Sequence, residues 1–359
     1  MVTSQQAQPH QPTDNWQQQV KPFRTPSTAR SVWQIVNTLV PYFGCWALMI
    51  WGLEHSIGVT VAATFVAGLL TVRLFIINHD CGHGSFFRSR QANEIVGFWT
   101  ALLVMTPYRQ WRHGHALHHA KSGKVEDRGI GYFWIMTLQE YRDAPALKKL
   151  WCRFYRHPLV LFIFGGFYLF VIEFRFTMRS DTPQTRRQVY LTNTLLAALF
   201  VGGGMLFGYL AFAILFLSVI TVATTIGLWL FFLQHHFEGA YWGTGDDWSY
   251  ERAALEGSSY IAMPALMEWF VGYINYHHIH HLVPKVPNYK LRAAHHAIPT
   301  FASVQPLTWR QILGAWKLRL VDEDTMQWVN FPTKAEMAKS PPASHSKEVS
   351  QRTATSVSG

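Results

Sequence analysis

The chain has 359 residues, of which 49% are hydrophobic, 15% aromatic and only 14% charged. A soluble domain typically carries about 25% charged residues, so the composition excludes an ordinary soluble protein and favours a membrane protein. The net charge of +10 suits an anionic bilayer surface or an acidic protein partner. No motif for reading DNA or RNA accompanies this charge, so we expect no nucleic-acid partner.

The two ends of the chain are poor in apolar residues. Residues 1–30 are rich in Gln and Pro and lack the apolar core of a signal peptide, and residues 331–359 are rich in Ser, Thr and Pro. We expect both ends to be disordered, with a single domain at residues 31–330. The cysteines, Cys45, Cys81 and Cys152, are too widely spaced for a disulfide framework or a metal-binding pair.

Three uncharged or nearly uncharged stretches predict membrane spans, since a crossing helix needs about 20 apolar residues. The first runs from Ser31 to Leu53, and the second begins at Ser56 and continues through Arg73 to Ile77. The third, from Gln188 to Phe237, contains no Asp, Glu, Lys or Arg and is long enough for two crossings. Four spans are therefore expected.

Two shorter apolar stretches, Val96–Tyr108 and Pro158–Ile172, are predicted to be interfacial or re-entrant helices. Basic residues flank the second stretch on both sides, which indicates that both its ends are cytoplasmic. The sequence thus predicts an all-α integral membrane protein with four transmembrane helices. Its N-terminus, its basic middle loop and a histidine-rich C-terminal cap should share the cytoplasmic face.

Most of the 18 histidines fall in four clusters at the cytoplasmic ends of the predicted spans or in the basic loops. On a helix, positions i, i+3 and i+4 share a face, so each HxxHH group can point its imidazoles one way. Imidazole binds Zn, Cu, Fe and Ni, and this many ligands exceeds the needs of one tetrahedral zinc, so two metals are implied. The clustered candidates are His79, His83, His115, His118, His119, His235, His277, His280 and His281.

The remaining histidines carry weaker signals. His10, His55, His157 and His345 are isolated and are interpreted as surface or packing residues. Neighbours of the clusters could either support ligands or simply pack, and the sequence leaves both roles open for His113, His236, His278, His295 and His296.

Several phrases in the chain resemble those of the membrane fatty acid desaturases, in particular the bacterial acyl-lipid desaturases. These phrases are HDCGHGSFF from His79, HALHHAKSG from His115, DRGIGYFW from Asp127, QHHFEGAYW from Gln234 and NYHHIHHLVPKVPNYKL from Asn275. The resemblance implies a non-haem di-iron centre held by the nine clustered histidines, with O2 as co-substrate and the acyl chains of membrane lipids as substrate. It also implies a multi-pass protein of the bacterial inner membrane whose active site faces the cytoplasm.

The chain departs from the stearoyl-CoA desaturases at one position. They carry Asn four residues before the isolated histidine, whereas Phe231 stands there in this chain, so a tenth ligand is unassigned. No fused cytochrome b5 motif is present, and the resemblance therefore implies a separate electron donor such as ferredoxin, which a basic enzyme would attract if the donor is acidic. Asp80, Asp127 and Glu238 could orient ligand imidazoles or could form ion pairs or be solvated.

The predicted reaction is the introduction of a cis double bond into an acyl chain, because removing hydrogen from unactivated methylenes needs a metal that activates O2. A histidine-rich di-iron hydroxylase or ketolase acting on an alkane or a carotenoid is the nearest alternative. A metal transporter is disfavoured, because the spans carry no path of ionisable residues. The sequence does not determine the position of the double bond, the chain length or the acyl carrier.

Overall fold

The computed structural model describes residues 15–338 except residues 130 and 132. Within that part of the chain, four helices are long and apolar enough to cross a membrane, which confirms the predicted all-α membrane fold. They are α2 (Thr28–His55), α3 (Ile57–His83), α9 (Pro183–Phe207) and α10 (Tyr209–His235). Helix α3 extends past the predicted end of its span, so the His79–His83 motif lies on its last turn.

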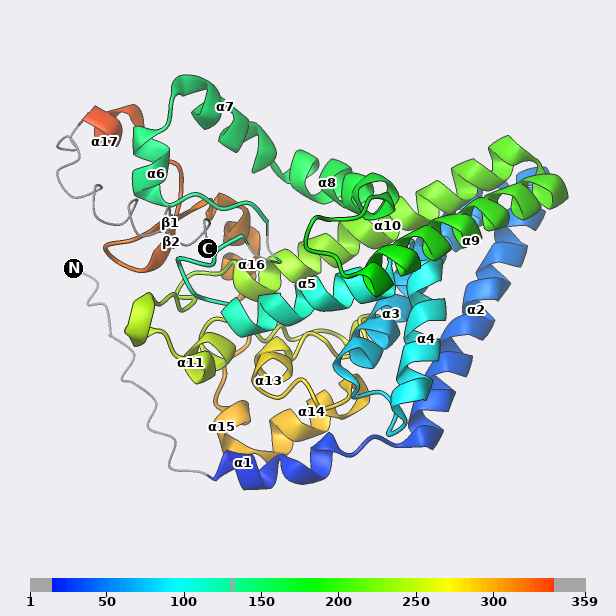
Figure 1. The fold of residues 1–359 in the computed structure, drawn as a ribbon, viewed down its shortest axis with the longest axis horizontal. Helices are drawn as coiled ribbons and strands as arrows, with labels where there is room; N and C mark the ends of the chain where they lie inside the picture. The colour runs from blue at the N-terminus through cyan, green and yellow to red at the C-terminus, as the bar shows by residue number, and fades with distance from the viewer. Residues whose placement is uncertain (1–14, 130, 132, 339–359) are drawn as a thin grey trace.

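The spans form two antiparallel pairs that pack on one another. Ser56 separates α2 from α3, and Gly208, with φ of +84°, separates α9 from α10. Helix α10 packs against α3, and Gly68 permits this close approach. A Cβ atom on Gly68 would lie 2.4 Å from Cγ1 of Val222 in α10. In Figure 1 the two tight turns lie together at the right of the molecule, far from the cap.

The remaining elements are short and belong mainly to the cap. A two-stranded antiparallel hairpin is formed by β1 (Leu320–Asp322) and β2 (Gln327–Val329). The short helices are α1 (Trp16–Gln19), η1 (Lys21–Arg24), α4 (Arg90–Leu103), α5 (Tyr108–Lys121), α6 (Leu138–Asp143), α7 (Ala146–Tyr155), η2 (Leu159–Phe164), α8 (Gly165–Phe167), η3 (Tyr168–Ile172), η4 (Glu173–Arg175), η5 (Gly245–Asp247), α11 (Tyr250–Leu255), α12 (Ala265–Phe270), α13 (His277–Leu282), α14 (Asn288–Ala297), α15 (Pro299–Ala302), α16 (Trp309–Gly314), η6 (Ala315–Lys317) and α17 (Lys334–Ala338).

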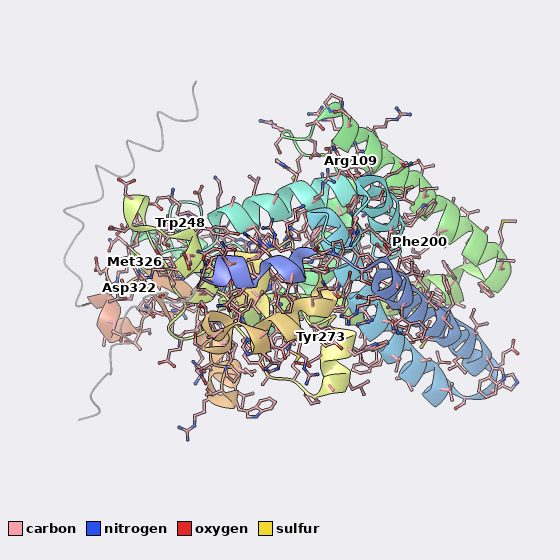
Figure 2. The ribbon with its side chains drawn as sticks, turned by 90° about the horizontal axis from the view of Figure 1, so that it is seen from below. Arg109, Phe200, Trp248, Tyr273, Asp322 and Met326 are labelled. Carbon is pink, nitrogen blue, oxygen red and sulfur yellow. The ribbon has the colours of Figure 1, made fainter. Side chains whose placement is uncertain are left out.

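The spans and the cap occupy opposite ends of the molecule. In Figure 2, Phe200 of α9 lies toward the end that holds the long helices, whereas Asp322 and Met326 of the hairpin lie at the other end. The largest hydrophobic cluster joins the two regions, because it contains Leu230 and Leu233 of α10 together with Ile279 and Leu282 of α13. The cap is thus packed directly onto the end of a span.

The two short apolar stretches form helices beside the bundle. Helix α4 packs along α3, with Ile95 and Trp99 exposed on its outer face. The segment from Leu159 to Arg175 is bent by 69° from α7 and packs against α10. The exposed side chains of α7 include Leu147, Leu150, Trp151 and Phe154, which lie on one face of that helix.

The prediction of disorder for residues 1–30 is wrong from residue 15 onward, and residues 1–14 lie outside the described part of the chain. Trp16 is buried, and its indole donates a hydrogen bond of 2.8 Å to Glu251. Ser27 accepts a hydrogen bond from the amide of Arg30 and so caps α2. These contacts are with residues distant in sequence or with the span itself, so composition alone did not reveal them.

The predicted C-terminal tail is also partly ordered. Phe331 packs against the ring of Tyr141, and Arg153 lies over Phe331. Residues Lys334–Ala338 form α17, and Oγ1 of Thr333 caps this helix by accepting a hydrogen bond from the amide of Glu336. The tail prediction is therefore wrong for residues 331–338, and residues 339–359 lie outside the described part of the chain.

Candidate metal centre

All nine clustered histidines lie close together, although they come from four separate parts of the chain. Helix α3 ends with His79 and His83, α5 contributes three histidines, α10 ends with His235, and α13 contributes three more. They form two groups in which the candidate ligand atoms lie within 4.8 Å of one another. The first cluster is His79, His83, His115, His119 and His280, and the second cluster is His118, His235, His277 and His281.

In the second cluster the Nε2 atoms converge. The Nε2 atom of His118 lies 3.2 Å from that of His235 and 3.2 Å from that of His281. The Nε2 atom of His277 lies 3.1 Å from that of His235. A neutral imidazole has one N–H, so a set of nitrogens that each face several others cannot be satisfied by hydrogen bonds alone. A shared cation would satisfy all of them.

The first cluster is built in the same way. The Nε2 atom of His119 lies 3.1 Å from that of His115 and 2.9 Å from that of His280. The Nε2 atom of His83 is buried and has no hydrogen-bond partner among the described residues. An unsatisfied buried nitrogen of this kind is costly unless it binds something that the protein recruits.

The spacing of these nitrogens distinguishes between coordination geometries. If a metal–nitrogen bond is about 2.1 Å long, ligands at right angles lie about 3.0 Å apart and tetrahedral ligands about 3.4 Å apart. The five closest Nε2–Nε2 pairs lie 2.9 to 3.2 Å apart, and the ligand atoms of each cluster all lie within 4.8 Å of one another. They fit the right-angled arrangement of a five- or six-coordinate metal better than tetrahedral zinc, and imidazole nitrogens suit iron. The residues present therefore fit two iron ions.

Each HxxHH group serves both clusters, which differs from the expectation that its three imidazoles point one way. His115 and His119 belong to the first cluster, whereas His118 belongs to the second. In α13 the division is reversed, with His280 in the first cluster and its neighbours in the second. Consecutive helical residues point about 100° apart, so the adjacent histidines at i+3 and i+4 diverge. His118 and His119 accordingly belong to different clusters, and their ring planes are 85° apart.

Burial keeps the cap histidines neutral, which is the form that binds a metal. Burial away from water is the larger cause and repulsion from neighbouring imidazoles the smaller one, and together they hold each pKa well below the ordinary value of 6.5. This applies to the ligand candidates outside the spans, namely His115, His118, His119, His277, His280 and His281. Their lone pairs are therefore available at neutral pH.

Three contacts from outside the clusters orient the ligand candidates. Oδ1 of the buried carboxyl group of Asp80 lies 3.1 Å from Nδ1 of His79, which leaves Nε2 of that ring to face the cluster. Nδ1 of His235 lies 3.2 Å from the carbonyl oxygen of Gly257. The indole of Trp328 donates to the carbonyl oxygen of His235 over 3.1 Å, which fixes the main chain of that residue.

The other two acidic candidates lie elsewhere. Asp127 forms ion pairs with Lys121 at 2.6 Å and Lys124 at 4.0 Å. Glu238 is exposed. Of the three carboxylates left open by the sequence, Asp80 is the one placed against a clustered imidazole. The contributions of Gly257 and Trp328 were not predicted, because they join residues 22 and 93 positions apart and leave no local pattern.

Phe231, the position at which the sequence departs from the stearoyl-CoA desaturases, lies beside the second cluster. Its ring centroid lies 5.2 Å from that of His118 and 5.6 Å from that of His235. A phenyl ring offers no ligand atom, and the second cluster has four histidines where the first has five. The sequence difference therefore coincides with the cluster that has fewer protein ligands.

The histidines left undecided by the sequence lie outside both clusters. His113 and His296 are exposed. His236 is buried between the rings of Phe232 and Trp328, with centroid distances of 4.1 and 4.2 Å. His278 and His295 are buried together, with Nε2 and Nδ1 3.3 Å apart. His55 and His157 are exposed, as an isolated histidine was expected to be, and His10 and His345 lie outside the described residues.

The clusters also determine how many times the chain crosses the membrane. His118 of α5 and His235 at the end of α10 share one cluster, so they lie on the same side. Between these two histidines the chain crosses the membrane twice, once through α9 and once, in the opposite direction, through α10. If the bent segment from Ala146 to Arg175 also crossed, the number of crossings between His118 and His235 would be odd, and the two histidines would lie on opposite sides of the membrane. The bent segment therefore enters and leaves from one face, as predicted for Pro158–Ile172.

Known proteins resemble this chain over the same region. The sequence profile of the family described as fatty acid desaturase matches residues 55–312, which include all nine histidines. A fatty acid desaturase of Bacillus subtilis is 42% identical over 313 residues, covering 87% of this chain and 89% of that protein. An sn-1 acyl-lipid omega-3 desaturase (ferredoxin) of Synechocystis sp. is 32% identical over 250 residues, or 65% of each protein. An sn-1 oleoyl-lipid 12-desaturase of Synechocystis sp. is 28% identical over 234 residues, covering 62% of this chain and 63% of that protein. This chain thus spans just under two thirds of each of these two Synechocystis proteins.

Proposed function

The chain belongs to the fatty acid desaturase family, and from that premise we propose that its nine clustered histidines hold two iron ions for the O2-dependent desaturation of acyl chains esterified in membrane lipids. The protein is an oxidoreductase that acts on acyl chains, as its acyl-lipid desaturase relatives indicate. The iron, the use of O2 and the roles of the individual histidines are the proposed parts.

One observation supports the proposal above all others. Nine mostly buried imidazoles from four separate segments converge in two adjacent groups, and their closest nitrogens are spaced like neighbouring ligands of a five- or six-coordinate metal. Burying so many polar groups without partners would be costly, and packing alone would be served better by apolar side chains. A di-iron centre accounts for both the number and the spacing of the histidines.

The reaction balance defines what the protein must supply. A saturated pair of methylenes, one O2, two electrons and two protons give one carbon–carbon double bond and two waters. The bound iron would supply the oxidising power that acid–base side chains lack. The residues of the chain orient the ligands, as Asp80 does for His79 and the Gly257 carbonyl does for His235. Phe231 closes one side of the second cluster with an apolar ring.

The four spans support a multi-pass membrane protein. We place it in a bacterial inner membrane, with the histidine-rich face on the cytoplasmic side. The basic flanks of the middle loop support that orientation, since Lys and Arg accumulate on the cytoplasmic side. The substrate chain would then reach the metal from the bilayer while its headgroup stays at the cytoplasmic surface. The electron donor would be a soluble one-electron carrier of the ferredoxin kind, as in the relatives whose names specify ferredoxin.

The reaction is tested by expressing the protein in a host with saturated or monounsaturated lipids. We expect a new cis double bond that depends on O2 and on reduced ferredoxin. The mass of the product separates the alternatives, because desaturation removes two hydrogens whereas a hydroxylase adds one oxygen. Faster conversion of labelled acyl-CoA than of labelled phospholipid would contradict the acyl-lipid substrate and leave the metal centre unaffected.

The metal centre is tested with one histidine from each cluster. We expect about two iron atoms per chain in the wild type. His118→Ala and His280→Ala should each lose iron and reduce desaturation by more than about 100-fold, because even residues that only support ligands contribute 10–100-fold. His113→Ala is the matched control, since His113 lies on α5 but is exposed. One zinc and no iron per wild-type chain would contradict the assignment.

A further inference from the structure

The first cluster comes closest to the solvent at the end of α3. Seven of the nine histidines are buried, whereas His83 and His115 have intermediate exposure, and both belong to the first cluster. His83 stands between Gly82 and Gly84, and Gly84 is exposed with φ of +62°. Gly82 packs against Trp111 and Arg112, whereas only Nζ of Lys285 lies within 4 Å of a Cβ atom placed on Gly84, so the main chain is open on the Gly84 side. A partner could therefore approach one proposed ligand closely at this turn.

A lysine from the cap marks the same turn. The exposed ammonium group of Lys285 donates a hydrogen bond of 2.6 Å to the carbonyl oxygen of His83. A Cβ atom on Gly84 would lie 3.3 Å from that Nζ atom. A surface cation is thus bonded directly to the residue through which the first cluster reaches the surface.

More cations lie near Lys290 of α14, five residues after Lys285. Lys290 of α14 donates to the carbonyl oxygens of Pro22 and Thr25, which holds η1 with its exposed Lys21 and Arg24 against the cap. The pKa of Lys290 is lowered by partial burial and by the nearby charges of Arg30 and Arg88. In Figure 1, α1, α14 and the beginning of α2 lie along one edge of the molecule. We call the set the basic edge: Lys21, Arg24, Arg30, Arg88, Lys285 and Lys290.

The basic edge is not neutralised from within. Within the described ranges, 15–338 without 130 and 132, none of its members forms an ion pair with a carboxylate. Glu94, at the start of α4, is engaged by Arg109 and Arg112, and the carboxyl group of Asp80 is buried. Uncompensated cations of this kind attract an acidic partner and accelerate its encounter with the protein.

We propose that the basic edge around the Gly82–Gly84 turn is the docking surface for an acidic one-electron carrier protein of the ferredoxin class. The inference rests on the proposed function, because only an enzyme that needs electrons needs such a partner. Per double bond formed, two carrier molecules are oxidised by one electron each, and those electrons enter through the first cluster. Four of the six cations lie on η1, on α14 or in the loop before α14, outside the four spans. The bond from Lys285 to His83 favours an electron carrier over lipid headgroups, because it connects the basic edge to a proposed metal ligand.

The test compares two double charge reversals of equal net charge. Arg24→Glu with Arg88→Glu alters the basic edge, and Lys148→Glu with Arg310→Glu alters exposed residues of α7 and α16. Each enzyme is reconstituted in vesicles and driven either by reduced ferredoxin or by dithionite, and ferredoxin binding is measured separately. We expect Kd for ferredoxin and the ferredoxin-to-dithionite rate ratio to change about tenfold in the edge variant alone, as expected for two exposed charge pairs. The effect should weaken at high salt.

Each other outcome contradicts the inference in a recognisable way. Unchanged ferredoxin binding and an unchanged rate ratio in the edge variant would show that the carrier docks elsewhere. If the ferredoxin-driven and the dithionite-driven rates of the edge variant fell equally, and more phosphatidylglycerol in the vesicles restored them, the basic edge would be a binding surface for anionic lipid. Absence of a double bond in the wild type with either reductant would contradict the proposed function itself, whereas salt-sensitive ferredoxin binding at the edge would still be measurable.

Discussion

Asp80 uses both carboxylate oxygens at the base of the first cluster. Oδ1 lies 3.1 Å from Nδ1 of His79, and Oδ2 accepts a hydrogen bond of 2.6 Å from the amide of Asn288. Asp80 therefore links the end of α3 to the start of α14 while it orients a proposed ligand. An amide side chain has a single oxygen and cannot make both contacts.

Asp80→Asn should therefore weaken iron binding by about 10–100-fold, the usual cost of removing a group that orients a ligand. Iron retention during titration with a chelator measures this effect. Asp127→Asn is the control, because Asp127 pairs with lysines and not with a clustered histidine. Equal retention by wild type and Asp80→Asn would remove Asp80 from any role at the cluster.

His295 makes the stability of the cap sensitive to acid. Burial, reinforced by the neighbouring His296, lowers the pKa of His295 from 6.5 to about 4. The unfolded chain therefore binds a proton between these two values while the folded chain does not. The contribution of this group to stability is complete above pH 6.5 and is lost as the pH falls from 6.5 toward 4.

We expect the wild type to lose more of its Tm between about pH 7.5 and about pH 5.5 than His295→Gln does, because glutamine does not titrate. The Tm of each protein in detergent at both pH values provides the measurement. His113→Gln should behave as the wild type, because His113 is exposed. A variant with the same acid sensitivity as the wild type would show that His295 has the same pKa in the folded and the unfolded chain.

Among the elements, the long helices follow from local sequence and the short ones do not. A run of apolar residues is a property of each span itself, so α2, α3, α9 and α10 were predicted from length and charge. The four-residue helix α1 is held by the bond from Trp16 to Glu251, 235 positions away. The HxxHH spacing predicted a metal site, but it did not show that α5 and α13 each divide their histidines between two clusters.

The contact of α3 with α10 depends on a glycine. A methyl group at Gly68 would lie 2.4 Å from Cγ1 and 2.8 Å from Cβ of Val222, and Val222 is on the neighbouring span. Gly68→Ala should therefore destabilise the protein by about 1–3 kcal/mol through overpacking, despite the higher helix propensity of alanine. The Tm in detergent measures the change.

Gly227→Ala in α10 is the matched control, since nothing lies within 4 Å of a Cβ atom at that position. We expect no loss of stability there and a gain of up to about 1 kcal/mol from helix propensity. If both substitutions changed the Tm equally, the two helices would have room to move apart at Gly68.

At the scale of the whole molecule, the shared clusters require an even number of crossings. Single cysteines at Lys124, Arg186 and Asp322 should react with an impermeant reagent from one side of the membrane, and cysteines at Ser56 and Gly208 from the other. The native Cys45, Cys81 and Cys152 are buried, so the wild type serves as the blank. Labelling of Arg186 from the side opposite to Lys124 would require the bent segment to cross and would separate the two halves of each cluster.

The histidines of the two clusters are synthesised at different stages of translation. Four of the five histidines of the first cluster, His79, His83, His115 and His119, are made before residue 120. The second cluster has only His118 by then and waits for His235, His277 and His281. A nascent chain that has reached residue 120 thus already contains four of the five ligand candidates of the first cluster, whereas three of the four candidates of the second cluster are still to be made. If the clusters hold iron as proposed, the first site approaches completion earlier in synthesis than the second.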